Sequence, residues 1–291
     1  MKYGCQSMTK KIKKIVLKHP KDAFVSDDHL EKNWKHYGYV EKPDYEKVLQ
    51  EFGVFESIIH EHVKEIMYLP QSNQVGLDSI YTHDSIKITK KGAIYFNTGK
   101  TLRQNEFLEM ERLLQANQIP TLGKINSPGL MEGGDVLWLD DDTVLVGRGY
   151  RTNDEGIKQF KELIKGFVKN VIVIPMPHGE GQDACLHLMS IISMINPKLA
   201  VVYSKYMPVF MRELLINRGI ELLEVDDKEY EYLGSNVLAL DEKKCIIIEG
   251  NPKIESMLAE KGCEVFTYPG RHLSYFGTGG PTCLTCPVYR D

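Results

Sequence analysis

The chain has 291 residues, of which 42% are hydrophobic and 26% are charged. These proportions are typical of a globular protein that can bury a sizeable core, and they exclude disordered, collagen-like and fibrous classes. With 36 Lys and Arg against 40 Asp and Glu, the net charge of −4 leaves no basic excess for the phosphates of a nucleic acid.

The sequence carries no sign of a membrane or secreted protein. No apolar run approaches the roughly 18 residues that a membrane helix needs, and no apolar signal-peptide core follows the basic N-terminus. We therefore expect a cytoplasmic protein with neither a membrane nor a nucleic acid as partner. Six cysteines are too few for a disulfide scaffold, so we expect free thiols.

Short runs of β-forming residues alternate with amphipathic segments along the whole chain, which predicts an α/β fold. A strand pair, a helix and a returning strand recur, so we expect repeated β-β-α-β units in a single domain spanning residues 1–291. The predicted strands are Ile12–Leu17, Glu65–Leu69, Ser85–Thr89, Gly92–Asn97, Val136–Leu139, Thr143–Gly147, Val171–Met176, Leu199–Tyr203, Asn236–Leu240, Cys245–Glu249 and Glu264–Tyr268. The predicted helices are Tyr45–Glu61, Arg103–Gln118, Asp154–Phe167, Pro208–Arg218 and Lys253–Lys261.

The segment Leu77–Asp84 carries two carboxylates that a packed core does not need. Asp78 and Asp84 are six residues apart, so in an extended segment both side chains would point to the same side. They could then face one pocket. The alternative is a polar loop in which each Asp caps a turn.

The run Glu132-Gly133-Gly134-Asp135 comes directly before a predicted strand. Paired glycines allow a sharp turn and a close approach to a ligand, which would aim the flanking carboxylates Glu132 and Asp135. A simple Gly-Gly turn explains the pattern equally well. His187 poses a similar choice, because a lone histidine in an apolar run is either a core residue or an imidazole that burial holds in the neutral, proton-accepting form.

The C-terminal segment Gly277–Pro287 holds the pair Cys283-x-x-Cys286. A zinc site would need two further ligands with suitable spacing, and a thioredoxin-like pair would open a helix early in a βαβ unit. A phosphate-binding loop would end in Gly-Lys-Ser/Thr. The remaining interpretation is a Gly-rich segment that delivers one cysteine to a pocket, which together with His187 and the acids provides groups for covalent catalysis.

Taken in order, these motifs resemble the guanidine-modifying superfamily of arginine deiminases, dimethylarginine dimethylaminohydrolases and glycine amidinotransferases. The resemblance extends from about Lys13 to Arg290 and rests on Asp-x5-Asp, an arginine, Glu-Gly-Gly-Asp, Arg-Thr-Asn, His-Leu and Gly-Gly-x-x-Cys-x-x-Cys-Pro. It implies a pentein α/β propeller of five β-β-α-β units around a pseudo-fivefold axis, with the active site at its centre. It implies no cofactor and no metal.

The resemblance also implies roles for eight residues of this chain. For catalysis these are Cys283 as nucleophile, His187 as general acid/base, and Glu132 as the carboxylate that contacts both the guanidinium and the histidine. For substrate binding they are Asp84 at the guanidinium, Asp78 at the α-amino group, Arg103 and Arg151 at the α-carboxylate, and Asp135 of the Glu-Gly-Gly-Asp motif.

The residue types suit a hydrolase that cleaves a C–N bond at the guanidino carbon of arginine or N-methylated arginine. Carboxylates can hold the planar cation in front of a sulfur, and the Cys283 thiolate, favoured by the bound cation and His187, can attack its carbon. His187 can protonate the leaving amine and then activate a water molecule against the covalent intermediate. The expected products are citrulline and an amine.

Three departures bear on the substrate. Met189 stands where arginine deiminases carry an Asp, which resembles the dimethylarginine hydrolases. His83 stands where those hydrolases carry an acid, while Thr282–Arg290 looks more like deiminases and amidinotransferases. Alternatives are therefore an amidinotransferase, an arginine deiminase, a citrulline ureido hydrolase, or an amino-acid-binding module without turnover. The partner is a small guanidino or ureido amino acid, and a homodimer stays open.

Overall fold

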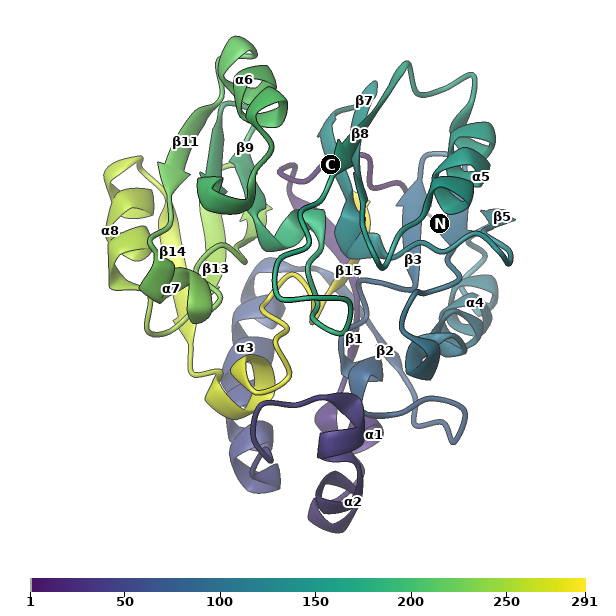
Figure 1. Ribbon diagram of the computed structural model, residues 1–291. Helices are drawn as coiled ribbons and strands as arrows, with labels where there is room; N and C mark the ends of the chain where they lie inside the picture. The colour runs from purple at the N-terminus through teal and green to yellow at the C-terminus, as the bar shows by residue number, and fades with distance from the viewer. Residues whose placement is uncertain (1) are drawn as a thin grey trace.

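The computed structural model describes residues 2–291. Within them, fifteen strands form five sheets of three strands each. In every sheet the middle strand runs antiparallel to one neighbour and parallel to the other. The expected mixed α/β fold is confirmed, and Figure 1 shows the helices toward the outside of the molecule.

The five sheets follow the chain in order, except that the last strand joins the first sheet. That sheet contains β15 (Cys286–Arg290), β1 (Ile12–Lys18) and β2 (Glu65–Leu69). The others contain β3 (Ile86–Thr89), β4 (Gly92–Tyr95) and β5 (Thr121–Lys124); β6 (Val136–Asp140), β7 (Thr143–Arg148) and β8 (Asn170–Pro175); β9 (Ile192–Asn196), β10 (Leu199–Val202) and β11 (Glu221–Glu224); and β12 (Leu238–Asp241), β13 (Lys244–Ile248) and β14 (Glu264–Tyr268).

A helix lies between the second and third strand of every unit, which makes each unit β-β-α-β. These helices are α3 (Tyr45–His62), α4 (Glu106–Ala116), α5 (Asp154–Ile164), α6 (Val209–Asn217) and α8 (Pro252–Glu260). The additional helices are α1 (Pro20–Ala23), α2 (Asp27–Tyr37) and α7 (Asp227–Glu231), and short helical turns occur at Leu77–Ile80, Thr101–Arg103, Gly133–Asp135, Leu188–Ser190, Ser204–Tyr206 and Arg271–Tyr275.

Helix α5 illustrates how local sequence sets an element and places a neighbour. The side chain of Asn153 accepts a hydrogen bond from the backbone N–H of Gly156 and so caps the helix. Ile157, Phe160 and Ile164 form its buried face. The same Asn153 oxygen also accepts from the N–H of Leu130, at 3.0 Å, which ties the helix start to the segment that leads to Glu132.

All eleven predicted strands are present, with ends that differ by a few residues. The strands β5, β9, β11 and β15 and the helices α1, α2 and α7 were not predicted. The predicted helix at Arg103 begins only at Glu106, because Thr101–Arg103 forms a separate turn. No helix within residues 2–291 combines the length and the apolar character needed to cross a membrane.

The C-terminal strand completes the N-terminal sheet. β15 pairs antiparallel with β1, so that Ile12 faces Arg290 and Val16 faces Cys286. The loop between β14 and β15 contains the Gly-rich segment, and this pairing brings it beside the start of β3. The pairing of the two ends of the chain therefore helps to hold the residues that precede β15 in place.

Glu51 of α3 anchors the beginning of that loop. Its carboxylate accepts hydrogen bonds from the backbone N–H groups of His272, at 2.9 Å, and Leu273, at 2.7 Å. We predict that Glu51→Ala lowers the free energy of unfolding by about 1–3 kcal/mol, because two buried donors lose their acceptor. Urea denaturation measures the change. Glu51→Gln, which keeps an oxygen acceptor, should lose clearly less, and equal losses in both variants would contradict the prediction.

Candidate active site

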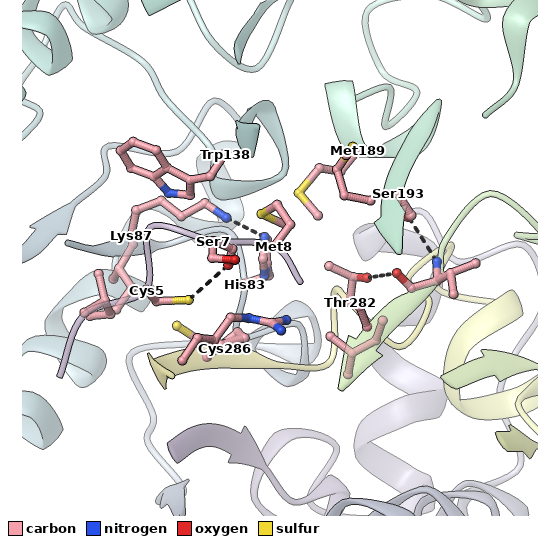
Figure 2. A pocket seen from close by; sticks show the side chains of 18 residues that line it. Cys5, Ser7, Met8, His83, Lys87, Trp138, Met189, Ser193, Thr282 and Cys286 are labelled. Carbon is pink, nitrogen blue, oxygen red and sulfur yellow. Dashed lines mark hydrogen bonds between the residues drawn. The ribbon is translucent and has the colours of Figure 1, made fainter. Parts of the chain in front are cut away.

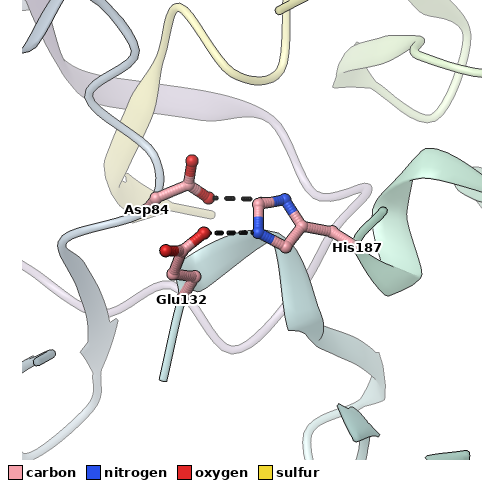
Figure 3. Close-up of side chains that lie close together, drawn as sticks. All are labelled: Asp84, Glu132 and His187. Carbon is pink, nitrogen blue, oxygen red and sulfur yellow. Dashed lines mark hydrogen bonds and ion pairs between the residues drawn. The ribbon is translucent and has the colours of Figure 1, made fainter. Parts of the chain in front are cut away.

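Two carboxylates and an imidazole meet in a buried cluster. The Nε2 atom of His187 lies 2.6 Å from Glu132 Oε2, and its Nδ1 atom lies 4.0 Å from Asp84 Oδ1. All three residues are buried, and Glu132 has no exposed surface. Figure 3 shows the two carboxylates on the same side of the imidazole ring. The cluster offers negative charge toward a planar cation.

The ligand atoms of these residues lie within 4.8 Å of one another, a spacing that also suits a metal ion. Protein groups already engage both carboxylates, however. Asp84 accepts from Arg103 at 2.6 Å, and Glu132 accepts from the N–H of Lys100 at 3.0 Å in addition to its bond with His187. An organic cation can still bind to these carboxylates, because its N–H groups can donate to the lone pairs that the protein leaves free.

The paired glycines allow the close approach that their pattern predicted. The N–H groups of Gly133 and Gly134 donate to the backbone oxygen and to Oδ1 of Asp84, both at 2.9 Å. A Cβ atom on Gly134 would lie 2.5 Å from Nδ1 of His187. The glycines therefore let the segment that carries Glu132 pack directly against the His187 ring.

Asp135, expected to bind substrate, has both carboxylate oxygens engaged by the protein. Its Oδ2 accepts from the hydroxyl of Thr152 at 2.6 Å, and its Oδ1 accepts from the N–H of Leu188 at 2.9 Å. Burial raises the pKa of Asp135 to about 6. This carboxylate joins the His187 turn to the Arg151-Thr152 segment, so its geometry is that of a group that positions others.

The protonation of His187 differs from the expected neutral imidazole. Burial works against the charged ring, but the Cys185 thiol and the Asp84 carboxylate outweigh it and raise the pKa of His187 well above its usual value. The effect is mutual for His187 and Asp84: the positive charges of His187 and Arg103 lower the pKa of Asp84 despite its burial. The cluster is therefore a set of mutually stabilised ions.

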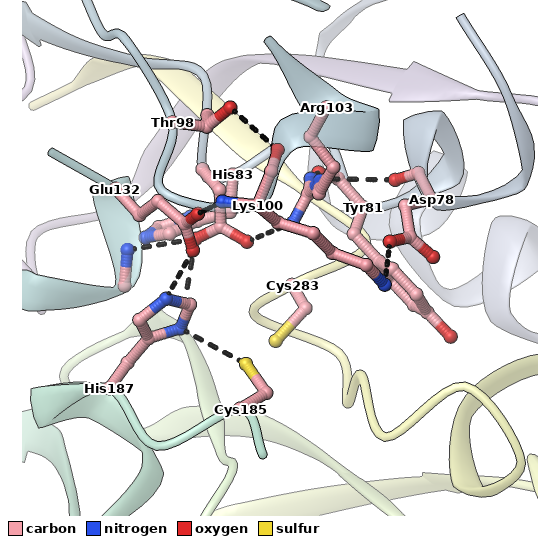
Figure 4. A network of polar contacts seen from close by, with 12 residues as sticks. Asp78, Tyr81, His83, Thr98, Lys100, Arg103, Glu132, Cys185, His187 and Cys283 are labelled. Atoms are coloured by element: carbon pink, nitrogen blue, oxygen red, sulfur yellow. Dashed lines mark hydrogen bonds and ion pairs between the residues drawn. The ribbon is translucent and has the colours of Figure 1, made fainter. Parts of the chain in front are cut away.

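Cys283 lies beside this cluster at the end of the Gly-rich segment. Its thiol accepts a hydrogen bond from the side-chain amide of Asn236 at 3.3 Å, and the Asn236 oxygen accepts from the N–H of Thr282 at 3.0 Å. Burial raises the pKa of the Cys283 thiol to about 12. Figure 4 shows the sulfur pointing toward Cys185 and His187.

The six cysteines are free, as expected. Cys286 is buried in β15, apart from the polar network, so the two cysteines of the C-terminal pair have different environments. Cys185 is the cysteine beside the imidazole, with its sulfur 3.6 Å from His187 Nδ1. Sequence reasoning missed Cys185 and Asn236, since neither belongs to a motif.

Asp78 lies in a helical turn, so the condition of an extended segment is not met, yet its side chain joins the same polar network. Its Oδ2 accepts from Lys100 Nζ at 2.6 Å. Lys100 was not predicted, although it links three parts of the site: its Nζ also donates to the backbone oxygen of Tyr37 at 2.7 Å, and its backbone N–H reaches Glu132 (Figure 4).

The two arginines have different surroundings. The guanidinium of Arg103 is buried and donates to Asp84, to both oxygens of Glu106, and to the backbone oxygen of Tyr81. The guanidinium of Arg103 therefore donates to groups of the protein itself, and it fixes the Asp84 carboxylate. Among residues 2–291, the Arg151 side chain bonds only Glu132, at 3.5 Å from both oxygens, which leaves several of its N–H donors for a ligand.

The space beside His187 can be tested through Gly134. We predict that Gly134→Ala lowers the free energy of unfolding by about 1–3 kcal/mol, because the new methyl group would overlap the imidazole. Gly149→Ala is the matched control, since the nearest side-chain atom lies 3.5 Å from its Cβ position. Chemical denaturation compares them, and equal stability of the two variants would contradict the proposed close contact.

The protonation of Cys283 gives a second prediction. A thiol with a pKa of about 12 gains thiolate about tenfold per pH unit, so alkylation by iodoacetamide should keep accelerating from about pH 7 to pH 10. Site-resolved peptide mass spectrometry measures the rate. Cys286, which has a similarly raised pKa of about 12 but is buried, reports the effect of access. A plateau for Cys283 below pH 9 would contradict the prediction.

Comparison with known proteins places this geometry in a family. A family model described as arginine deiminase matches residues 60–221 and 212–290. The arginine deiminase of Mycobacterium avium (strain 104) is 28% identical over 191 residues, covering 55% of this chain and 46% of that protein. The chain thus spans about half the length of such relatives.

Two further proteins match a larger share of this chain. The N(G),N(G)-dimethylarginine dimethylaminohydrolase of Streptomyces coelicolor is 24% identical over 224 residues, covering 77% of this chain and 80% of that protein. The structure of a dimethylarginine dimethylaminohydrolase mutant from Pseudomonas aeruginosa, complexed with citrulline, has a TM-score of 0.74 at 20% identity and covers 95% of this chain and 99% of that one. With most of its length matched by the family model, the chain belongs to the arginine deiminase family of the guanidine-modifying superfamily.

Proposed function

We propose that the protein is a hydrolase that cleaves a C–N bond at the guanidino carbon of arginine or N-methylated arginine, giving citrulline and an amine. The observation that carries this proposal is the buried bond between His187 and Glu132, with Asp84 on one side and the Cys283 thiol nearby. Relatives named as arginine deiminases and as a dimethylarginine hydrolase support the same reaction class.

The substrate guanidinium lies between Asp84 and Glu132. Both carboxylates stay ionised in the buried site, since His187 lowers the pKa of each of them. Two ionised acids can hold a planar cation through paired charge-assisted hydrogen bonds and fix its carbon in front of Cys283. In this position the guanidinium also compensates the negative charge of the two buried carboxylates, which would otherwise cost free energy.

The bound cation activates the nucleophile. Without substrate the Cys283 thiol is protonated; a guanidinium beside it favours the thiolate by direct attraction, and the thiol proton passes to solvent because His187 already carries one. The sulfur then forms a bond to the guanidino carbon, and the protonated His187 gives its proton to the departing amine. Water loses a proton to His187 and attacks the thiouronium carbon, and the S–C bond breaks to release citrulline and the thiol.

The remaining residues of the site hold the amino-acid end of the substrate. Arg151 has free donors for the α-carboxylate, and Asp78, held by Lys100, accepts the α-amino group. Arg103 acts through Asp84, and Asp135 acts through the His187 turn, so we assign both as positioning residues.

Met189 favours an N-methylated substrate over arginine. It is 6% exposed and packs in an apolar cluster with Leu188 and Met194. The position therefore offers no carboxylate for a second terminal nitrogen of the guanidinium. Met189 also lines an internal cavity, so its support for an N-methylated substrate is the missing carboxylate alone.

We further propose that the five sheets surround one pseudo-fivefold axis, as in a pentein propeller, and that residues 1–291 form one catalytic domain in the cytoplasm. The five sheets share one topology, which supports this arrangement. Residues of the first strand of every sheet, β3, β6, β9, β12 and β15, also line a single internal cavity.

The proposal is tested by mass-resolved product analysis with arginine, asymmetric dimethylarginine and citrulline, each with and without glycine. Dimethylamine and citrulline from the dimethylated substrate establish the methylarginine hydrolase, and ammonia from arginine establishes a deiminase. Products that form only with glycine identify an amidinotransferase. No product under any of these conditions contradicts the proposed substrate class.

We predict that Cys283→Ser abolishes turnover, because serine is a far weaker nucleophile toward this carbon. His187→Ala should lower kcat by about 10²–10⁴-fold through loss of the proton donor and acceptor. Steady-state kinetics with the substrate found above measures both variants. Unimpaired turnover in either one, with the fold intact by circular dichroism, would contradict the mechanism.

Arg151→Ala should mainly raise KM, by about 10- to 100-fold, because a charge-assisted bond to the substrate carboxylate is lost in ground and transition state alike. Arg148→Ala is the control, since that arginine is exposed and pairs with Asp154 at the surface. A fall in kcat at unchanged KM for the Arg151 variant would exclude a role in carboxylate binding.

A further inference from the structure

A partly open cavity of about 30 Å³ lies among the N-terminal segment and the first strands of the five sheets. Most of its lining is apolar, from residues such as Met8, Ile88 and Met194. Besides His83, three side chains with N–H groups line it, namely Lys87 of β3, Trp138 of β6 and Arg290 of β15. Figure 2 shows Lys87 and Trp138 side by side above His83.

Two buried cations face this cavity without a counter-ion. Lys87 is 8% exposed and Arg290 is 6% exposed. Among residues 2–291, no carboxylate lines the cavity, and none lies within 4.0 Å of either cation. Two positive charges without a counter-ion are costly in a largely apolar cavity, where burial lowers the pKa of Lys87 to about 8, and such charges in proteins are as a rule compensated.

The partners that these side chains have are neutral. The Nδ1 atom of His83 lies 3.0 Å from the backbone oxygen of Thr285 and therefore carries the hydrogen, which leaves Nε2 to accept from Lys87 Nζ at 2.7 Å. Burial lowers the pKa of His83 to about 3, so the ring stays uncharged. Arg290 donates from one terminal nitrogen to the backbone oxygen of Lys10 at 2.6 Å.

Two donors have no acceptor at all. Within residues 2–291, neither Nε of Arg290 nor Nε1 of Trp138 has a hydrogen-bond partner, and both atoms are buried. Buried donors of this kind are rare in native proteins, so each calls for a bound acceptor. An acceptor that also carries negative charge would satisfy these donors and compensate Lys87 and Arg290 together.

We propose that this cavity is a binding site for a small monovalent inorganic anion of halide size, held between Lys87, Arg290 and Trp138. A single water molecule needs roughly 10–15 Å³ on the same measure, so the space of about 30 Å³ takes one such ion with a water molecule but no amino acid. The site does not depend on the proposed hydrolase function, because none of its three ligating residues belongs to the catalytic cluster.

The anion site nevertheless adjoins that cluster through His83. The ring of His83 contacts Lys87 in the cavity, its backbone N–H donates to the carbonyl oxygen of Cys283 at 3.3 Å, and the next residue is Asp84. Thr282, which precedes Cys283, also lines the cavity. A bound anion thus supports the backbone from which the candidate nucleophile and a guanidinium carboxylate project.

Trp138 serves as the reporter, because the chain has only two tryptophans. In Trp34→Phe, all tryptophan fluorescence comes from Trp138, and sodium bromide replaces sodium gluconate at constant ionic strength. We expect saturable quenching by bromide that chloride reverses by competition. Lys87→Met in this background should weaken the apparent bromide affinity about tenfold or more. Lys18→Met, which removes a buried lysine outside the cavity, should leave the affinity unchanged.

Quenching that stays linear and weak, or that is the same in the Lys87 variant, overturns the proposal. Should Lys87→Met fail to fold, crystals of the unchanged protein grown in bromide decide the matter. An anomalous peak within hydrogen-bond distance of Arg290 Nε and Trp138 Nε1 supports the anion site. A map without that peak at high bromide overturns it.

Discussion

The hydrogen bond between His187 and Glu132 is the interaction on which the site depends. Both groups are buried, and His187 lowers the pKa of Glu132 through this bond despite the burial of the carboxylate. The nearby Asp84 adds a second negative charge, which Arg103 compensates from the side opposite to the imidazole. The strands and turns that hold these residues thus hold an ion network whose members cannot be removed singly without leaving a buried charge uncompensated.

Charge is divided along the interior of the molecule. The cluster of Asp84, Glu132 and His187 holds two carboxylates, whereas the neighbouring cavity is lined by Lys87 and Arg290 and by no acid within residues 2–291. His83 lies between the two regions and stays neutral, which separates the negative cluster from the positive cavity.

Much of the fold and site could be predicted because the signals were local. Strands with apolar, β-branched runs were found, whereas β5 and β11 are short and polar and β15 contains Pro287, so their pairing depends on distant partners. The motif residues do gather in one network. Lys100 and Asn236 were missed because each is a single polar residue whose role arises only when separate loops meet.

The pairing of β15 with β1 bears on how the protein is made at the ribosome. β1 is translated early, yet its antiparallel partner follows every other element of the described chain. Closing so long a loop is entropically costly and slow. A chain that lacks β15 would keep Cys283 and the acids, but it would lose the strand pairing that holds the Cys283 segment beside His83.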